Sequence, residues 1–204
     1  NVTVTVVAPP TAPTSISGIT TICSGQSTTL TATGGSVGGG ATYQWYAGGC
    51  GSGSVLGTGS SLSVSPTSTT TYYVRRLGTS PCGSTTTACA SVTVTVVAPP
   101  TAPTSISGTT TICSGQSTTL TATGGSVGGG CTYQWGTGST VGSNIISGAT
   151  SSSYTTPALS TSTTYWVRRI GNSPCSNTTG GVTQTVTVTP NASAGTVSAG
   201  TTPQ

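Results

Sequence analysis

Hydrophobic and polar residues alternate along several short segments of the chain, and this period of two predicts β-strands. In one such segment Tyr43 and Trp45 fall on one face, while Gln44 and Tyr46 fall on the other. Turns rich in glycine, proline and serine separate the segments, and no segment has the period of a helix. In the first half of the chain, strands are predicted over 27–33, 42–46, 60–66, 71–77 and 90–97. The chain is therefore predicted to be all-β.

The same pattern occurs twice, with a shift of 90 residues. Residues 2–45 and 92–135 are identical except that Ile19 and Ala41 are replaced in the second copy. A repeat of this length indicates an array of small domains. The predicted division is a terminal strand of a preceding repeat over 1–9, a first repeat over 10–98, a second repeat over 99–190, and the start of a following repeat over 191–204. The valine-rich segment 1–8 is expected either to pair with a neighbouring copy of the chain or to belong to a longer array of repeats, because a bare strand edge is normally covered.

Each repeat has the features of an immunoglobulin-like β-sandwich. Such a domain has about seven short strands, a core tryptophan in the middle of the sequence and a tyrosine late in it. Trp45 and Trp135 are the predicted core tryptophans, and Tyr72 and Tyr165 are the late tyrosines. Large apolar side chains are few, so each core is small, and small extracellular domains are commonly stabilised by disulfides. We expect two tandem, disulfide-stapled immunoglobulin-like domains.

Several motifs carry a resemblance to a known group of proteins. They are ICSGQSTTLTATGG, YQW, TTTYYVRR, SPC and ASVTVTV, and together they span about residues 10–190. This series resembles the immunoglobulin-like repeats of giant secreted surface proteins of Bacteroidetes, a group that includes gliding-motility adhesins of the SprB type. The resemblance implies a place on the cell surface and export through the type IX pathway. The family often carries acidic residues, whereas this chain has none.

The seven cysteines favour disulfides over a metal site, because the chain has no histidine or carboxylate side chain to join them. Cys50 and Cys89 are both missing from the second repeat, which suggests that they bond to each other. The favoured set is Cys23–Cys82, Cys50–Cys89 and Cys113–Cys175, with Cys131 left over. The Cα atoms of two disulfide-bonded cysteines must lie within roughly 7 Å of each other. The turn that holds Cys23 and the hairpin that holds Cys82 are expected at opposite ends of the sandwich, which argues against this pair. A second set therefore stays open: Cys23–Cys50, Cys82–Cys89 and Cys131–Cys175. The cysteine left over is either an intermolecular bridge or a buried thiol.

The composition excludes most kinds of chemistry. The chain has no Asp, Glu, His or Lys, and its net charge of +4 comes from four arginines. Acid–base catalysis needs a side chain that titrates near the working pH, and a serine nucleophile needs a base. Calcium and magnesium sites normally need carboxylates. Four arginines in 204 residues also give little attraction to nucleic acid. We expect no enzymatic activity, no metal, no cofactor and no nucleic-acid partner.

One exposed face is the candidate contact site. If Tyr72 and Val74 face the core, their neighbours in the YYVRR and YWVRR motifs face solvent together with residues of the adjacent strand. The resulting set is Gln44, Tyr46, Tyr73, Arg75, Trp166 and Arg168. Aromatic rings beside a guanidinium and an amide could stack on a sugar. The same groups could instead contact another protein, or stabilise the sheet by stacking across strands.

Three functional hypotheses follow. The first is a structural, non-catalytic repeat of an extracellular fibre or adhesin stalk, in which the proline-rich linker 97–105 is stiff. The second is an adhesin module whose repeats bind glycans or surfaces directly. A third, ice binding by Thr-x-Thr rows, is disfavoured because sandwich strands twist. The expected partners are neighbouring repeats or copies of the same chain. The expected location is extracellular, on the cell surface, with no membrane insertion in this segment.

Overall fold

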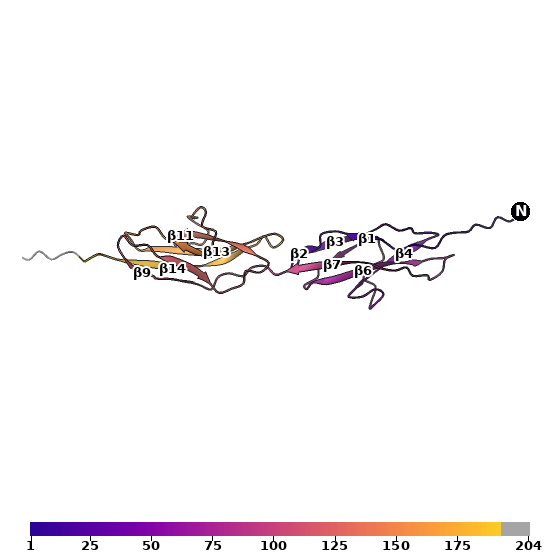
Figure 1. Cartoon of the computed structure of the whole chain (residues 1–204), viewed down its shortest axis with the longest axis horizontal. Coiled ribbons are helices and arrows are strands. Elements are labelled where there is room, and N and C mark those ends of the chain that lie inside the picture. Colours follow the sequence, from indigo (N-terminus) through magenta and orange to yellow (C-terminus); the bar gives the residue numbers. More distant parts are fainter. Residues whose placement is uncertain (193–204) are drawn as a thin grey trace, which may run out of the picture. The chain divides into compact units, whose positions relative to one another are not determined.

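The computed structural model describes residues 1–192 and consists of two compact units (Figure 1). The first unit contains Asn1–Pro99 together with the short segment Ser173–Ser176. The second contains Pro100–Asn172 and the residues from Asn177 onward. In the described part of the chain, all regular structure is β-strand, and no helix is present that is long and apolar enough to cross a membrane.

The first unit has seven strands in two sheets. The three-stranded sheet has the order β1-β3-β5 and the four-stranded sheet the order β2-β7-β6-β4. Neighbouring strands are antiparallel except β2 and β7, which are parallel. The strands are β1 (Ser15–Ser17), β2 (Thr21–Cys23), β3 (Thr28–Thr33), β4 (Ala41–Ala47), β5 (Ser61–Val64), β6 (Thr70–Gly78) and β7 (Ala90–Val97). The chain changes sheets between β1 and β2, two short strands that the alternation did not predict.

The core of the first unit lies around one tryptophan. Trp45 and Leu30 are fully buried between the sheets, and Val74 and Val94 pack against them. The indole Nε1 of Trp45 donates a hydrogen bond of 2.8 Å to the carbonyl of Gly59, so its polar atom is satisfied inside the core. These side chains point inward because they occupy alternate positions of their strands.

The second unit has the same strand order. Its sheets are β12-β10-β8 and β11-β13-β14-β9, again with one parallel pair, β14 with β9. Trp135 takes the place of Trp45, and Tyr154 lies between Trp135 and Tyr165 with ring centroids 5.9 and 5.8 Å apart. The strands are β8 (Ser105–Ser107), β9 (Thr111–Cys113), β10 (Thr119–Thr123), β11 (Cys131–Thr137), β12 (Ser153–Thr155), β13 (Thr163–Gly171) and β14 (Thr178–Thr189). The prediction of two tandem immunoglobulin-like sandwiches is confirmed.

Hydroxyl groups pair across the strands on the outer faces, where most proteins carry charges. In the first unit Thr71 pairs with Thr93 at 2.9 Å, and Thr31 with Ser61 at 3.0 Å. The second unit repeats the arrangement, with Thr164 and Thr185 at 2.8 Å. Such cross-strand pairs stabilise a sheet modestly. The abundance of threonine and serine is therefore part of the sheet structure.

The first eight residues form no strand within this chain. Val2, Val4 and Val6 are almost fully exposed, and regular contact with the first unit begins where Gly39 N donates to the carbonyl of Ala8 at 2.9 Å. Pairing of 1–8 with another copy stays a prediction. The predicted start of a following repeat falls mainly on 193–204, which lies outside the described residues.

The stability of both units is expected to be flat in acid and to fall in alkali. No Asp, Glu or His side chain is present to gain a proton between neutral pH and pH 2, and such protonation drives most acid unfolding. Burial raises the pKa of Tyr72. The pKa of Tyr165 is raised mainly by burial and to a smaller extent by the nearby Tyr154. A raised folded pKa means that the unfolded chain loses its proton first. This contribution is therefore complete below about pH 10 and is lost as the pH rises through the folded pKa values.

Calorimetry at pH 2, 7 and 11 measures this directly. We expect equal melting temperatures at the two lower values and a lower one at pH 11. Replacing Tyr72 and Tyr165 by phenylalanine should reduce the alkaline loss. A marked fall in melting temperature between pH 7 and pH 2 would contradict the prediction.

Candidate functional site

A buried arginine is held at one end of the first sandwich by main-chain carbonyls. Arg76, on β6, is only 4% exposed. Its Nη1 donates to the carbonyl of Thr11 at 2.6 Å, and its Nη2 donates to Gly34 at 2.9 Å and to the hydroxyl of Tyr43 at 3.0 Å. The guanidinium carbon also lies 5.0 Å from the centre of the Tyr43 ring. Because the chain has no carboxylate side chain, this cation is stabilised by dipoles and an aromatic ring alone.

The second unit contains the same arrangement around Arg169 of β13, which is 3% exposed. Its Nη1 donates to the carbonyl of Thr101 at 2.7 Å and its Nη2 to Gly124 at 2.8 Å. The guanidinium carbon lies 5.2 Å from the centre of the Tyr133 ring. The turn residues Gly35 and Gly125 have positive φ, and a Cβ on either would lie within 2.6 Å of the arginine Nη1. Glycine is therefore required for the turn to approach the guanidinium.

These arginines fix the proline-rich segments that lead into the two sandwiches. Thr11 N donates to Ser36 O at 2.9 Å, while Ser36 N donates to the Thr11 hydroxyl at 2.7 Å, so this segment is bonded to the turn in both directions. Thr101 and Ser126 repeat the same pair of bonds at 2.9 and 2.7 Å. Each lead-in segment is thus part of its sandwich. This role of the second arginine of each pair was not predicted, although alternation from Tyr72 and Val74 already places Arg76 inward.

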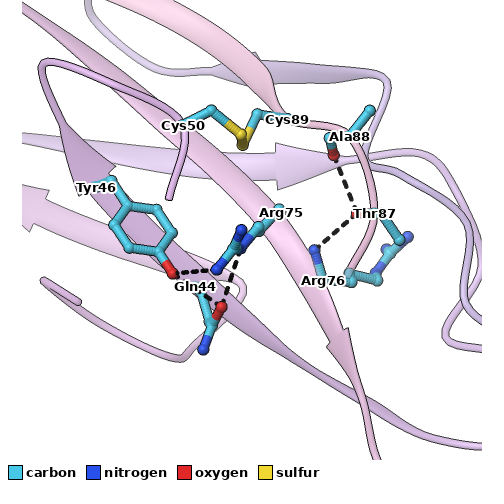
Figure 2. Close-up of a disulfide and its surroundings, with 8 residues drawn as sticks. All are labelled: Gln44, Tyr46, Cys50, Arg75, Arg76, Thr87, Ala88 and Cys89. Carbon is cyan, nitrogen blue, oxygen red and sulfur yellow. Dashed lines mark hydrogen bonds between the residues drawn. A yellow bond between two sulfur atoms is a disulfide. The ribbon is translucent and has the colours of Figure 1, made fainter. Parts of the chain in front are cut away.

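The predicted contact face of the first unit is covered and bonded within itself (Figure 2). Arg75 donates from Nε to Gln44 Oε1 at 3.0 Å and from Nη2 to the hydroxyl of Tyr46 at 2.9 Å. The Tyr46 hydroxyl in turn donates to Gln44 Oε1 at 2.8 Å. Tyr46 is 3% exposed, and Gln44, Tyr73 and Arg75 are half-buried.

In the second unit a different ring fills the same space. Tyr46 corresponds to Gly136, which pairs with Trp166 of the next strand, and Trp166 is fully buried. A Cβ on Gly136 would overlap the indole, so the glycine makes room for the tryptophan. Trp166 Nε1 donates to Ser143 O at 2.8 Å, and Arg168 lies over the ring while its Nε donates to Gln134 at 2.8 Å.

The prediction that Tyr46 and Trp166 are exposed is wrong. The loops that follow β4 and β11 fold back over the outer face of these strands, and alternation within a strand gives no sign of a covering loop. Gly51 and Gly142 show how close the loops come, since a Cβ on either would lie within 3.0 Å of an Nη1 of Arg75 or Arg168. The two rings are therefore not available to stack on a sugar.

A disulfide holds the covering loop of the first unit. Cys50 in this loop is bonded to Cys89, just before β7, with Cα atoms 6.0 Å apart (Figure 2). This is the pairing that the joint absence of both cysteines from the second repeat suggested. In the second unit, the strand register makes Gly181 the counterpart of Cys89. A Cβ added to Gly181 would lie 2.7 Å from the side chain of Val141, which takes the place of Cys50. An apolar contact thus replaces the disulfide in the second unit.

The second disulfide joins Cys23 to Cys175, with Cα atoms 4.9 Å apart. The predicted pairings Cys23–Cys82 and Cys113–Cys175 are therefore wrong, and so are Cys23–Cys50, Cys82–Cys89 and Cys131–Cys175. Cys23 ends β2, whereas Cys82 lies in the β6–β7 hairpin at the other end of the sandwich, as the geometric objection required. Cys175 belongs to the segment of 173–176 that forms part of the first unit. Cys82, Cys113 and Cys131 are thiols.

The described residues offer little catalytic chemistry. Among residues 1–192, no three His, Cys, Asp or Glu side chains are grouped so that they could hold a metal ion. A hollow of about 340 Å³ beside β5 is lined by Ala47, Leu62, Val64 and Tyr72, together with uncharged neighbours. The polar arrangements described above bind parts of the chain to each other.

Comparison with known proteins gives one family match. Residues 10–97 and 100–190 each match the model of a family described as an Ig-like domain, CHU_C associated. No curated protein matches the chain.

The solved structures that match the chain are distant from it in sequence. Extracellular domains 3–5 of Drosophila OTK are 14% identical, with a TM-score of 0.45, over 91% of this chain and 61% of that one. The three N-terminal domains of the highly immunogenic outer capsid protein of bacteriophage RB49 are 20% identical, with a TM-score of 0.42, over 89% and 59%. Domains A168–A170 of titin are 19% identical, with a TM-score of 0.45, over 90% and 68%. The chain thus spans about three fifths of the length of the first two structures.

Proposed function

Because the chain belongs to the family of CHU_C-associated Ig-like domains, with two consecutive copies, we propose that it is a structural repeat of an extracellular bacterial surface fibre or adhesin stalk. In this proposal the repeats are non-catalytic. Their role is to extend the protein away from the cell, in contact with neighbouring repeats or with copies of the same chain.

The observation that carries the proposal is the way each sandwich binds its own lead-in segment. Thr11 and Thr101 are bonded in the same way, through buried Arg76 and Arg169, to turns of the sandwich that follows them. A flexible tether would leave such main-chain groups to water. Here a charged group is buried in each unit to hold that unit's own lead-in segment, which suits a repeat that serves as a structural part of a stalk.

Two further features support an extracellular place. Two disulfides are typical of proteins outside the reducing cytoplasm. The outer faces carry hydroxyl pairs, and the chain has no Asp, Glu or His side chain, so acid outside the cell is expected to change the charge of the sheets little. An immunoglobulin-like fold is also usually non-enzymatic.

Labelling of intact cells tests the proposal. An antibody against the folded chain should bind cells that make the protein without permeabilisation, and immunogold should mark extended fibres in electron micrographs. Cells lacking the gene are the control. Label that appears only after permeabilisation, or that is absent from any extended structure, would contradict the proposal.

A further inference from the structure

Four structural features surround and form the Cys23–Cys175 disulfide, and three of the four occur a second time in the first unit. Cys23 ends β2 and is paired in register with Val97 at the end of β7. The sulfur of Cys175 lies 3.4 Å from the carbonyl oxygen of Val97. The bond is thus built from a turn cysteine (Cys23), the end of a valine-rich strand (Val97), a Ser-Pro-Cys hairpin and a hairpin cysteine (Cys175).

Cys82 is a hairpin cysteine, and it already lies against the end of a valine-rich segment, at Val7 and Ala8. It ends the Ser-Pro-Cys sequence of the β6–β7 hairpin, as Cys175 does in its own hairpin. Its sulfur lies 3.9 Å from the carbonyl of Val7 and 3.6 Å from that of Ala8. Residues 2–8 are identical to 92–98, so Val7 stands at Cys82 where Val97 stands at Cys175. What Cys82 lacks is a turn cysteine.

Cys113 is a turn cysteine, like Cys23, but among the described residues no hairpin cysteine is bonded to it. It ends β9 in register with Thr189, the counterpart of Val97, and is exposed. The turn that follows is bonded as in the first unit, because Ser114 N donates to Thr189 O at 2.9 Å and Ser24 N donates to Val97 O at 2.9 Å. The residues around Cys23 and Cys113 also share the sequence TTICSGQ.

We propose that Cys82 and Cys113 are each one half of a further bond of the Cys23–Cys175 type. Cys82 bonds the turn cysteine of a repeat whose last strand ends at Val7, and Cys113 bonds the hairpin cysteine of a repeat that follows. Both partners are repeats of this kind in the same polypeptide. In such an array every repeat is joined to the next by one disulfide in addition to the backbone.

The bond forms by thiol–disulfide exchange with a small-molecule disulfide such as oxidised glutathione. One thiolate attacks the small disulfide and releases one small thiol, giving a mixed disulfide. The second thiolate then attacks the protein sulfur of the mixed disulfide and releases the other small thiol. The protein thiols lose two electrons and two protons in total, and the small-molecule disulfide gains them.

A three-repeat chain tests the proposal. Residues 10–91 placed directly before Val2 create one further repeat with a native junction, because residues 2–8 repeat 92–98. After oxidative refolding, alkylation under denaturing conditions and mass spectrometry count the thiols. We expect three thiols, as in the two-repeat chain, since the added turn cysteine bonds Cys82 and the added Cys50 and Cys89 counterparts bond each other. Two additional thiols in a chain that retains Cys23–Cys175 would overturn the proposal.

Two variants of the three-repeat chain identify the partner. Cys82→Ser should expose the added turn cysteine and raise the count by one, whereas the control Cys131→Ser should lower it by one. Non-reducing electrophoresis should show a monomer. Disulfide-linked dimers that vanish with Cys82→Ser would show an intermolecular bond and overturn the proposal. The inference rests on the proposed function only in assuming an array, and its thiol count is independent of where the protein is found on the cell.

Discussion

Replacing Arg169 by methionine is expected to lower the free energy of unfolding of the second unit by about 3 kcal/mol, because hydrogen bonds of charged groups contribute about 1.5–3 kcal/mol each. Methionine keeps much of the volume but leaves the carbonyls of Thr101 and Gly124 without their donor. It also removes the cation above Tyr133. Chemical denaturation followed by tryptophan fluorescence measures the loss.

The adjacent arginine provides a matched control. Arg168 lies on the same strand, is half-buried, lies over the Trp166 ring and, among residues 1–192, donates one side-chain hydrogen bond, to Gln134, so Arg168→Met is expected to cost about 1 kcal/mol. Arg169→Lys keeps the charge but loses the planar fork that reaches two carbonyls, and should lie between the two. Equal losses for the methionine variants of Arg168 and Arg169 would show that the buried guanidinium has no special role.

Reduction is expected to destabilise the first unit more than the second, because both disulfides have their cysteines in the first unit. The Cys50–Cys89 bond closes a loop with a sequence separation of 39, and the chain-entropy relation assigns such a loop about 4 kcal/mol. The second unit has Val141 against Gly181 in the same place, which a reductant does not affect. Calorimetry with and without reductant should therefore show the transition of the first unit moving to lower temperature by more than that of the second.

The variant Cys50→Ser/Cys89→Ser isolates this disulfide from Cys23–Cys175 and should reproduce only the part of the shift that Cys50–Cys89 contributes, since the longer Cys23–Cys175 loop has a sequence separation of 152. A chelator such as EDTA provides the control and should change neither transition. If EDTA lowered the melting temperature as much as the reductant does, the cysteines would be holding a metal.

Alternation within strands was enough to predict the sandwich and its core. Trp45 and Val74 occupy alternate positions that face inward, and both are fully buried. Tyr46 and Trp166 occupy the opposite positions and were expected to be exposed. Loops that cover a sheet face are held by contacts distant in sequence, so the period of a strand carries no information about them. For Arg76, alternation predicts that the side chain points inward. Its burial, however, depends on the carbonyls of residues 11, 34 and 36, which are distant in sequence.

The disulfides illustrate the same limit. Joint loss of Cys50 and Cys89 from one repeat is visible in the sequence, and it led to the bond that the structure contains. Cys23 and Cys82 are instead retained in both repeats, and pairing was assumed to stay within a repeat. The observed separation of 152 residues shows that retention of a cysteine in every repeat is equally compatible with a bond outside its own repeat.

The Cys23–Cys175 bond also determines how the chain responds to mechanical tension. When the chain is pulled from its two ends, the load leaves the backbone at Cys23, crosses the sulfur bridge and returns to the backbone at Cys175. Residues 24–174 lie between the two bridged cysteines, so tension cannot extend this stretch of backbone while the bridge is intact. At about 3.5 Å per extended residue, the bridge withholds roughly 500 Å of chain from stretching. Strands β1, β2 and β14 lie outside the bridge and remain extensible, so two thin, weakly charged units together have the extensibility of a much shorter peptide.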